Sequence, residues 1–161
     1  MNKNARGNYE ESFCVIPLCL QNLVLFDIID GMRKSQKGRL VSNGVVLMKH
    51  ERETVSVFLK RGYNIELIPP SNNPKTKMPD LLMNGLTWEM KSPQGRGKAT
   101  IEHIFKKAAK QSENLIIDLR RLRRKQEQGA IRILRRRFAQ SKRVKRLYIV
   151  DFKGELFYME K

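Results

Sequence analysis

The 161-residue sequence predicts an α+β domain with a central mixed sheet flanked by helices, and three observations support this fold class. Apolar residues recur at helical spacing in some segments and alternate in others, which indicates helices and half-buried strands in one chain. Asn84-Gly85 stands between two apolar runs, the strongest short-range signal for a β-hairpin. From residue 45 the element order is therefore α-β-β-β-α-β, followed by a C-terminal α-β-β extension.

Each element from residue 45 onward has its own signal. Apolar residues at helical spacing predict helices at 45–61, 100–112 and 120–140, and Gly62 is a suitable end for the first of them. Short runs of β-forming residues predict strands at 63–68, 80–83, 86–91, 115–119, 147–150 and 155–158.

Residues 1–44 are interpreted as an N-terminal apolar appendage and linker, preceding a domain at 45–161. The apolar part is interrupted by Pro17 and Asp27, so no transmembrane segment is predicted. No signal peptide is recognised. The sequence contains two cysteines, which match no zinc-binding pattern and make a poor disulfide framework. We therefore expect a location in the reducing cytoplasm.

The net charge of +17 predicts attraction to polyanions such as nucleic acid. Thirteen lysines and arginines fall within residues 120–146, where Glu127 is the single acid. Like charges four residues apart destabilise a helix, so a helix face of one sign favours substrate binding over simple solvation. The predicted nucleic-acid-binding residues are Arg120, Arg121, Arg123, Arg124, Arg132, Arg135 and Arg136.

The hairpin predicts a cluster of charged side chains. With a two-residue turn at Asn84-Gly85, Asp80 lies opposite Glu89 and the two side chains project from the same face. Lys91 shares that face, because it is two residues from Glu89 on one strand. Two opposed carboxylates repel each other, so a positive group is expected between them: Lys91, a divalent cation, or both.

Glu51 is the fourth candidate, because it projects from the apolar stripe of the preceding helix. A carboxylate on a packed face is costly unless it is paired or bound to a metal. Simpler roles exist for each acid. Asp80 could be a turn residue, Glu89 and Lys91 could be solvated strand residues, and Glu51 could flank its helix N-terminus, where acids are favourable.

These residues resemble a known group of enzymes. Pro79-Asp80 and Glu89-Met90-Lys91, after a helix bearing Glu51, are similar to the motif of the PD-(D/E)xK nuclease superfamily, and the element order resembles its restriction-endonuclease-like core. Residues 45–119 also resemble C-terminal toxin domains of contact-dependent inhibition (CdiA) proteins, including tRNA-cleaving ones. The similar segments read GYNIELIPP, PDLLMNG, WEMKSPQG and TIEHIFKKAAKQSENLIIDL.

The resemblance implies a metal-dependent endonuclease that hydrolyses phosphodiester bonds, with RNA, and tRNA in particular, favoured over DNA. Asp80, Glu89 and Glu51 would be metal ligands, Lys91 would activate water and stabilise charge, and Gln111 would be auxiliary. Mg²⁺ is the expected metal, with Mn²⁺ and Zn²⁺ as alternatives. An acidic immunity protein is an expected partner, and the toxin would act in the cytoplasm of a target bacterium.

Three alternatives stay open on the sequence. A metal-independent, barnase-like (BECR) ribonuclease toxin could use His50, Lys91, Thr100 and His103. The chain could also be a non-catalytic nucleic-acid-binding protein of a phage or mobile element. A third alternative is an interaction domain that an acidic partner neutralises.

Overall fold

The computed structural model describes residues 37–73, 77–94 and 97–161, and the predicted appendage lies mainly outside them. The strands are β1 (Leu40–Val41), β2 (Ile65–Leu67), β3 (Leu81–Met83), β4 (Leu86–Lys91), β5 (Asn114–Asp118), β6 (Arg146–Val150) and β7 (Leu156–Glu160). The α-helices are α2 (Lys49–Lys60), α3 (Lys98–Ala108) and α4 (Glu127–Gln140), with a short 3-10 helix at Arg124–Gln126.

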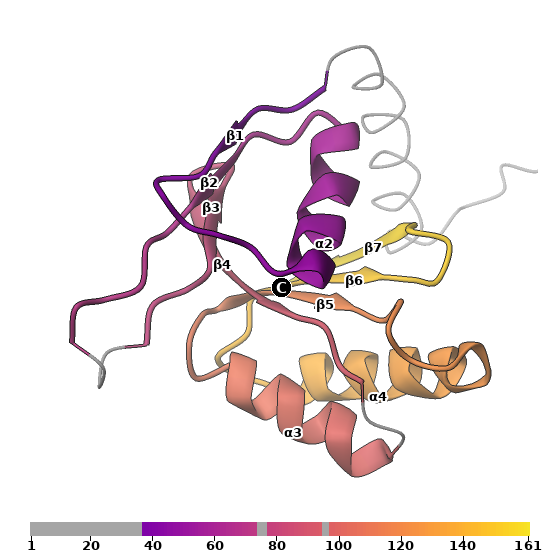
Figure 1. The fold of residues 1–161 in the computed structure, drawn as a ribbon. Coiled ribbons are helices and arrows are strands. Elements are labelled where there is room, and N and C mark those ends of the chain that lie inside the picture. The colour runs from indigo at the N-terminus through magenta and orange to yellow at the C-terminus, as the bar shows by residue number, and fades with distance from the viewer. Residues whose placement is uncertain (1–36, 74–76, 95–96) are drawn as a thin grey trace, which may run out of the picture. The chain divides into compact units, whose positions relative to one another are not determined.

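The seven strands form one mixed sheet whose order follows the order of the strands along the chain. The β2–β3, β3–β4 and β6–β7 pairs are antiparallel, whereas β4, β5 and β6 run parallel to one another. Helix α2 covers one face of the sheet, and α3 and α4 lie side by side on the other (Figure 1). The parallel centre brings the carboxyl ends of β4, β5 and β6 to a common edge.

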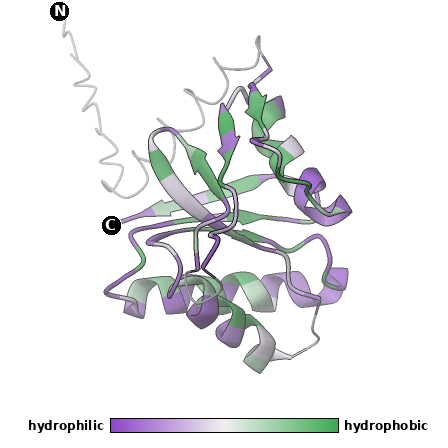
Figure 2. Cartoon of the chain, turned by 60° about the vertical axis from the view of Figure 1, so that its left-hand side comes forward, coloured by the Kyte–Doolittle hydropathy of each residue, from purple (hydrophilic) through white to green (hydrophobic). Residues whose placement is uncertain are grey.

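Alternation along the central strands builds a separate core on each face. On the α2 side, Trp88 and Met90 pack with Ile116 and Tyr148 beneath the helix. On the other side, the odd-numbered residues of β5 pack against α3 and α4. Apolar residues line the sheet and the inward helix faces, while polar residues cover the outward ones (Figure 2). Residues 89 and 91 of β4 therefore belong to the α3 side.

The predicted hairpin register is confirmed. Met83 pairs with Leu86, Leu82 with Thr87 and Leu81 with Trp88. Asn84 and Gly85 both have positive φ angles, 54° and 73°, as the two central residues of a type I′ turn require. A Cβ atom added to Gly85 would meet nothing within 4 Å, so the need for glycine there is purely conformational.

The predicted element order is confirmed, and the boundaries differ for local reasons. Helix α2 begins at Lys49, not residue 45, because Met48 has extended backbone and forms the N-cap. Helix α3 ends at Ala108, and residues up to Ser112 continue as turns. The predicted linker contains β1, which pairs with β2. No helix in the described part of the chain is long and apolar enough to cross a membrane.

Candidate active site

Asp80 lies immediately before β3 and is held alongside β4. Its backbone N–H donates to the Trp88 carbonyl oxygen (3.0 Å), and the Met90 N–H donates to Asp80 Oδ2 (2.7 Å). The strand ladder itself ends at the Leu81–Trp88 pair. The side-chain contact with Met90 nevertheless turns the Asp80 carboxylate toward the strand that carries Glu89.

Glu89 is a buried carboxylate without hydrogen bonds. Its side chain is 0% exposed, and neither carboxylate oxygen accepts a hydrogen bond from the residues that the structure describes. It forms an ion pair with Lys91, whose side chain is 28% exposed. A buried charge is costly unless it is paired and hydrogen-bonded. Glu89 therefore has one compensating charge and unused acceptor capacity.

Burial and the proximity of the predicted residues shift the pKa values of the two acids. Burial raises the pKa of Glu89 to about 7; Lys91 and Gln111 lower it, and the Asp80 charge raises it. Burial also raises the pKa of Asp80, against the lowering effects of the Met90 amide and Lys91. The structure thus brings together Asp80, Glu89, Lys91 and Gln111, which we name the acid–lysine cluster.

Gln111 and Glu51 occupy different positions relative to this cluster. Gln111 lies in the turn after α3, close enough to Glu89 for its side chain to affect that pKa. Glu51 caps its own helix: the Met48 N–H donates to Glu51 Oε2 (2.7 Å). The Glu51 charge still raises the pKa of Asp80. Glu51 therefore has a capping role and also lies within electrostatic range of the cluster.

The described residues contain no group of three or more His, Cys, Asp or Glu side chains able to hold a metal ion. The predicted third ligand, Glu51, is thus not gathered with Asp80 and Glu89. Two neighbouring carboxylates, one of them buried with no hydrogen-bond donor beyond its ion pair with Lys91, still fit a hard cation. Mg²⁺ commonly uses one or two carboxylates, with waters and substrate phosphate completing its shell.

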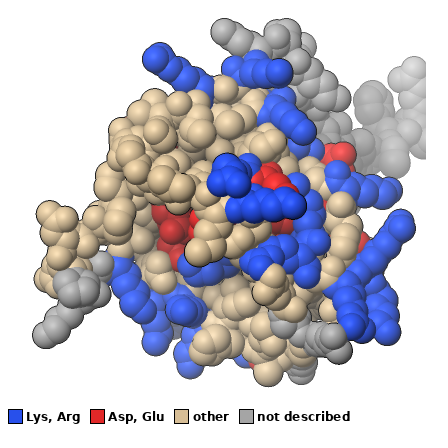
Figure 3. Space-filling view, viewed as in Figure 1, with Lys and Arg blue, Asp and Glu red and all other residues tan. Residues whose placement is uncertain are grey.

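The basic segment 120–146 divides into paired and exposed side chains. Arg136 and Arg137 form ion pairs with Glu102 on α3, and Arg120 pairs with Asp118. Among the predicted nucleic-acid contacts, Arg123, Arg124, Arg132 and Arg135 are exposed, and Arg136 is exposed although it is paired. Lysines and arginines are spread over the face shown in Figure 3, among a few small groups of acids. This distribution suits binding of a polyanion.

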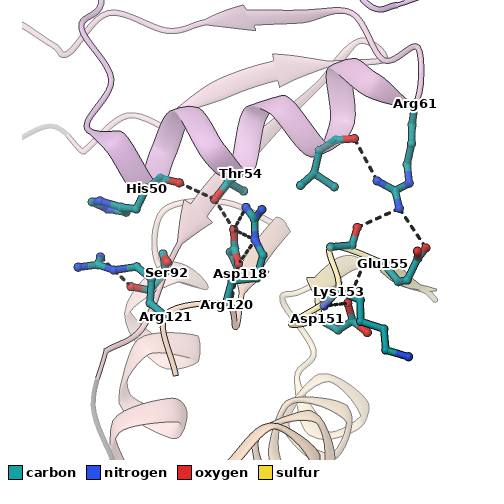
Figure 4. A network of polar contacts seen from close by, with 12 residues as sticks. His50, Thr54, Arg61, Ser92, Asp118, Arg120, Arg121, Asp151, Lys153 and Glu155 are labelled. Atoms are coloured by element: carbon teal, nitrogen blue, oxygen red, sulfur yellow. Dashed lines mark hydrogen bonds and ion pairs between the residues drawn. The ribbon is translucent and has the colours of Figure 1, made fainter. Parts of the chain in front are cut away.

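A second polar group, not predicted from the sequence, lies at the carboxyl end of β5. Asp118 is 2% exposed. Its carboxylate accepts hydrogen bonds from Thr54 Oγ1 (2.6 Å) and from Arg120 Nε (3.0 and 3.1 Å) and Nη2 (2.5 Å) (Figure 4). We name Thr54, Asp118 and Arg120 the β5-end network. The available sequence signal was an acid ending the apolar run LIIDL, followed directly by arginine.

The segment that carries the acid–lysine cluster matches a protein-family model over residues 77–156, just under half of the chain. The family is described as the contact-dependent growth inhibition CdiA C-terminal domain. Residues 77–156 are therefore similar to that family. The predicted resemblance to CdiA C-terminal domains is confirmed, and the matching region extends further toward the C-terminus than the predicted 45–119.

A solved structure is similar to a larger part of the chain than the family model is. The "CdiA-CT/CdiI toxin and immunity complex from Burkholderia pseudomallei" has a similar chain, with a TM-score of 0.59 and 16% sequence identity. The similarity covers 77% of this chain and 100% of that chain. At this identity the match establishes the α+β fold with its mixed sheet. No curated protein is similar enough to this chain to count as a relative.

The residues of the barnase-like alternative are distributed over two helices of the CdiA-type fold. His50 is in the first turn of α2, whereas Thr100 and His103 are in α3, and these helices cover opposite faces of the sheet (Figure 1). His103 is exposed. The sheet therefore separates the histidines, whereas the acids and lysine of the hairpin lie together.

The buried Glu89 predicts an unusual dependence of stability on pH. With a pKa of about 7 when folded and 4.5 as its ordinary value, Glu89 binds more protons in the folded state between these pH values. The contribution of Glu89 to the free energy of unfolding should therefore be complete below pH 4.5 and be lost as pH rises to about 7, with a slope of at most about 1.4 kcal/mol per pH unit. Denaturant titrations in EDTA across this range measure it.

The matched variants for this measurement are Glu89→Gln and Glu53→Gln. Glu89→Gln should flatten the pH dependence, because the group that exchanges the proton is gone. Glu53→Gln changes an exposed carboxylate on α2 and should keep the wild-type slope. Equal slopes in all three proteins would show that Glu89 ionises normally.

Proposed function

We propose that this protein is a toxin nuclease that hydrolyses nucleic-acid phosphodiester bonds, with RNA, and tRNA in particular, favoured over DNA. The observation that carries the proposal is the geometry of the hairpin: Lys91 pairs with the buried Glu89, and the Met90 amide holds the Asp80 carboxylate against the same strand. Gln111, in the turn after α3, also lowers the pKa of Glu89. The similarity of residues 77–156 to the CdiA C-terminal family and the exposed arginines near α4 support the proposal.

In the proposed reaction, Asp80 and Glu89 would hold a divalent metal, Mg²⁺ being the first choice. When bound, the metal supplies Lewis-acid chemistry at a phosphoryl oxygen and a lowered pKa for water. Lys91 stabilises negative charge on the phosphate and, by pairing with Glu89, favours the ionised form of that carboxyl. Gln111 lowers the pKa of Glu89 and so favours its charged form. Glu51 acts on the site electrostatically through Asp80.

The partners proposed are the nucleic-acid substrate and an acidic immunity protein. The similar chain from Burkholderia pseudomallei was solved as a toxin and immunity complex. A net charge of +17 would attract an acidic partner as well as nucleic acid. The site of action proposed is the cytoplasm of a target bacterium.

Cleavage assays with the purified full chain test this function. tRNA and plasmid DNA are incubated with Mg²⁺, with EDTA, and with EDTA followed by excess Mg²⁺. We expect tRNA cleavage that EDTA abolishes and Mg²⁺ restores. Cleavage that survives EDTA but is lost in His50→Ala would support the barnase-like mechanism instead. Salt-sensitive binding without cleavage would support the non-catalytic alternative.

Metal binding has its own measurement, independent of cleavage. A ligand that binds only the folded state raises the melting temperature. Titration with MgCl₂ should therefore raise the melting temperature of the wild-type protein, because the cation offsets repulsion between Asp80 and Glu89. The rise should disappear in Glu89→Gln and persist in Glu53→Gln. A rise of the same size in Glu89→Gln would exclude this pair of ligands.

A further inference from the structure

Arg121 differs from the other arginines of the basic segment in what it contacts. It is half-buried, and its Nη1 donates to the Ser92 carbonyl oxygen at 3.4 Å (Figure 4). Ser92 directly follows Lys91 at the end of β4. The guanidinium of Arg121 therefore lies against the strand that carries Glu89 and Lys91, one residue beyond the proposed catalytic lysine.

The residues on both sides of Arg121 are fixed in place. Arg120 is tied to Asp118 through its backbone N–H (3.0 Å) as well as its side chain. Leu122 is buried, and its N–H donates to the Leu119 carbonyl oxygen (2.9 Å). With both neighbours immobilised, the direction in which the Arg121 side chain leaves the backbone is set by the β5-end network.

The same network connects this loop to α2. Thr54 is fully buried, and its hydroxyl donates to Asp118 while lying 3.0 Å from the His50 carbonyl oxygen. The side chains of His50 and Arg121 extend toward the same side of the molecule in Figure 4. Thr54 thus joins the first turns of α2 to the segment that presents Arg121.

Arg121 retains hydrogen-bonding capacity for a ligand. A separation of 3.4 Å is long for a hydrogen bond, and a guanidinium has five N–H donors. Because Arg120 forms the ion pair with Asp118, the positive charge of Arg121 is not needed to balance that carboxylate. The Ser92 hydroxyl oxygen is buried and has no hydrogen-bond partner among the described residues. Two groups able to donate to an anion thus stand at the end of β4, directly after Lys91 in the chain.

We propose that Arg121, with the Ser92 hydroxyl, binds a phosphate of the nucleic-acid substrate beside Lys91, and that Thr54, Asp118 and Arg120 are positioning residues for it. The proposal rests on the proposed nuclease function for the identity of the substrate. Arg121 would hold the phosphodiester in register with the acid–lysine cluster, using the two-point geometry that guanidinium and phosphate share. The exposed arginines of α4 would instead contribute affinity at a distance from the cut.

Binding of inorganic phosphate to the full-length protein tests the site without any need for cleavage. The Nε–H signals of the arginines are followed by NMR during a phosphate titration. The Arg121 signal should shift and should saturate at about a tenfold lower phosphate concentration than the signal of the exposed Arg39. A difference in affinity of about tenfold is what one additional charge-assisted hydrogen bond usually contributes. An Arg121 signal that moves only together with Arg39 would overturn the proposal.

Variants of Thr54 test the positioning role. Thr54→Val removes the hydroxyl and should raise the phosphate concentration needed at Arg121 severalfold, whereas Thr54→Ser should restore it. In cleavage assays Arg121→Ala should lower kcat about tenfold with little change in KM, while Arg132→Ala should mainly raise KM. The effects of Thr54→Val and Arg121→Ala on kcat should not be additive, because both act through one guanidinium.

Different results would contradict the nuclease function, the phosphate-binding role of Arg121 and the positioning role of Thr54. A wild-type protein that binds phosphate at Arg121 but cuts no nucleic acid would overturn the nuclease function and leave the anion site. A wild-type protein that cleaves while Arg121→Ala keeps the full kcat would overturn the role of Arg121. Independent effects of Thr54→Val and Arg121→Ala would overturn the positioning role.

Discussion

Replacing Lys91 by methionine should lower the rate of nucleic-acid cleavage about a hundredfold or more while the protein stays folded. The Lys91 ammonium is paired with the fully buried Glu89 and sits beside Asp80, so it is the cation built into the cluster. Removing one preorganised group that stabilises transition-state charge typically costs a factor of about 10² to 10³ in kcat. Single-turnover cleavage of tRNA measures the effect.

Two comparisons make the Lys91 result specific. Lys106→Met removes an exposed lysine from α3 and should leave the rate unchanged. Loss of Lys91 should also move the pKa of Glu89 further upward, because Lys91 now lowers it. Near wild-type turnover in Lys91→Met, with an intact melting transition, would remove Lys91 from the mechanism.

Asp118→Ala should be the most destabilising single substitution among those considered for the polar residues. It leaves the partly buried Arg120 guanidinium without its acceptor and removes the shorter of the two acceptor contacts of the Thr54 hydroxyl. Removing one member of a buried ion pair costs about 3 kcal/mol or more, a large part of the 5–15 kcal/mol that typically stabilises a domain. Urea denaturation followed by circular dichroism measures the loss.

Glu113 provides the control, since it is an acid at the opposite end of β5 that pairs with Lys145 at the surface. Glu113→Ala should have little effect, because exposed ion pairs contribute little to stability. Asp118→Asn keeps the shape of the side chain and should fall between the two. If Asp118→Ala unfolds at the same urea concentration as Glu113→Ala, the β5-end network does not contribute to the stability of the fold.

The acid–lysine cluster could be predicted because its geometry is local. An Asn-Gly turn leaves one register for the hairpin, and alternation then places residues 89 and 91 on one face. For Glu51 the sequence allows two roles, because this residue lies both in the apolar stripe of its helix and in the first helical turn. The structure shows the capping contact, and the Glu51 charge also raises the pKa of Asp80.

The β5-end network could not be predicted because its contacts are distant in sequence. Thr54 and Asp118 are 64 residues apart and meet only because β4, β5 and β6 run parallel beneath α2. Strand β1 could not be predicted for a different reason. Its two residues are exposed and pair with β2 through the backbone, so no pattern of buried side chains marks them.

Asp80, Glu89, Lys91 and Gln111 all come from one uninterrupted stretch of chain, a hairpin followed by a single crossover helix. Short segments lose little entropy when their ends are brought together. These groups can therefore assemble early in folding, as soon as the hairpin docks on α3, whereas the Thr54–Asp118 contact must wait for α2 to return across the sheet. The acid–lysine cluster would therefore form first, and the β5-end network that positions Arg121 would form last.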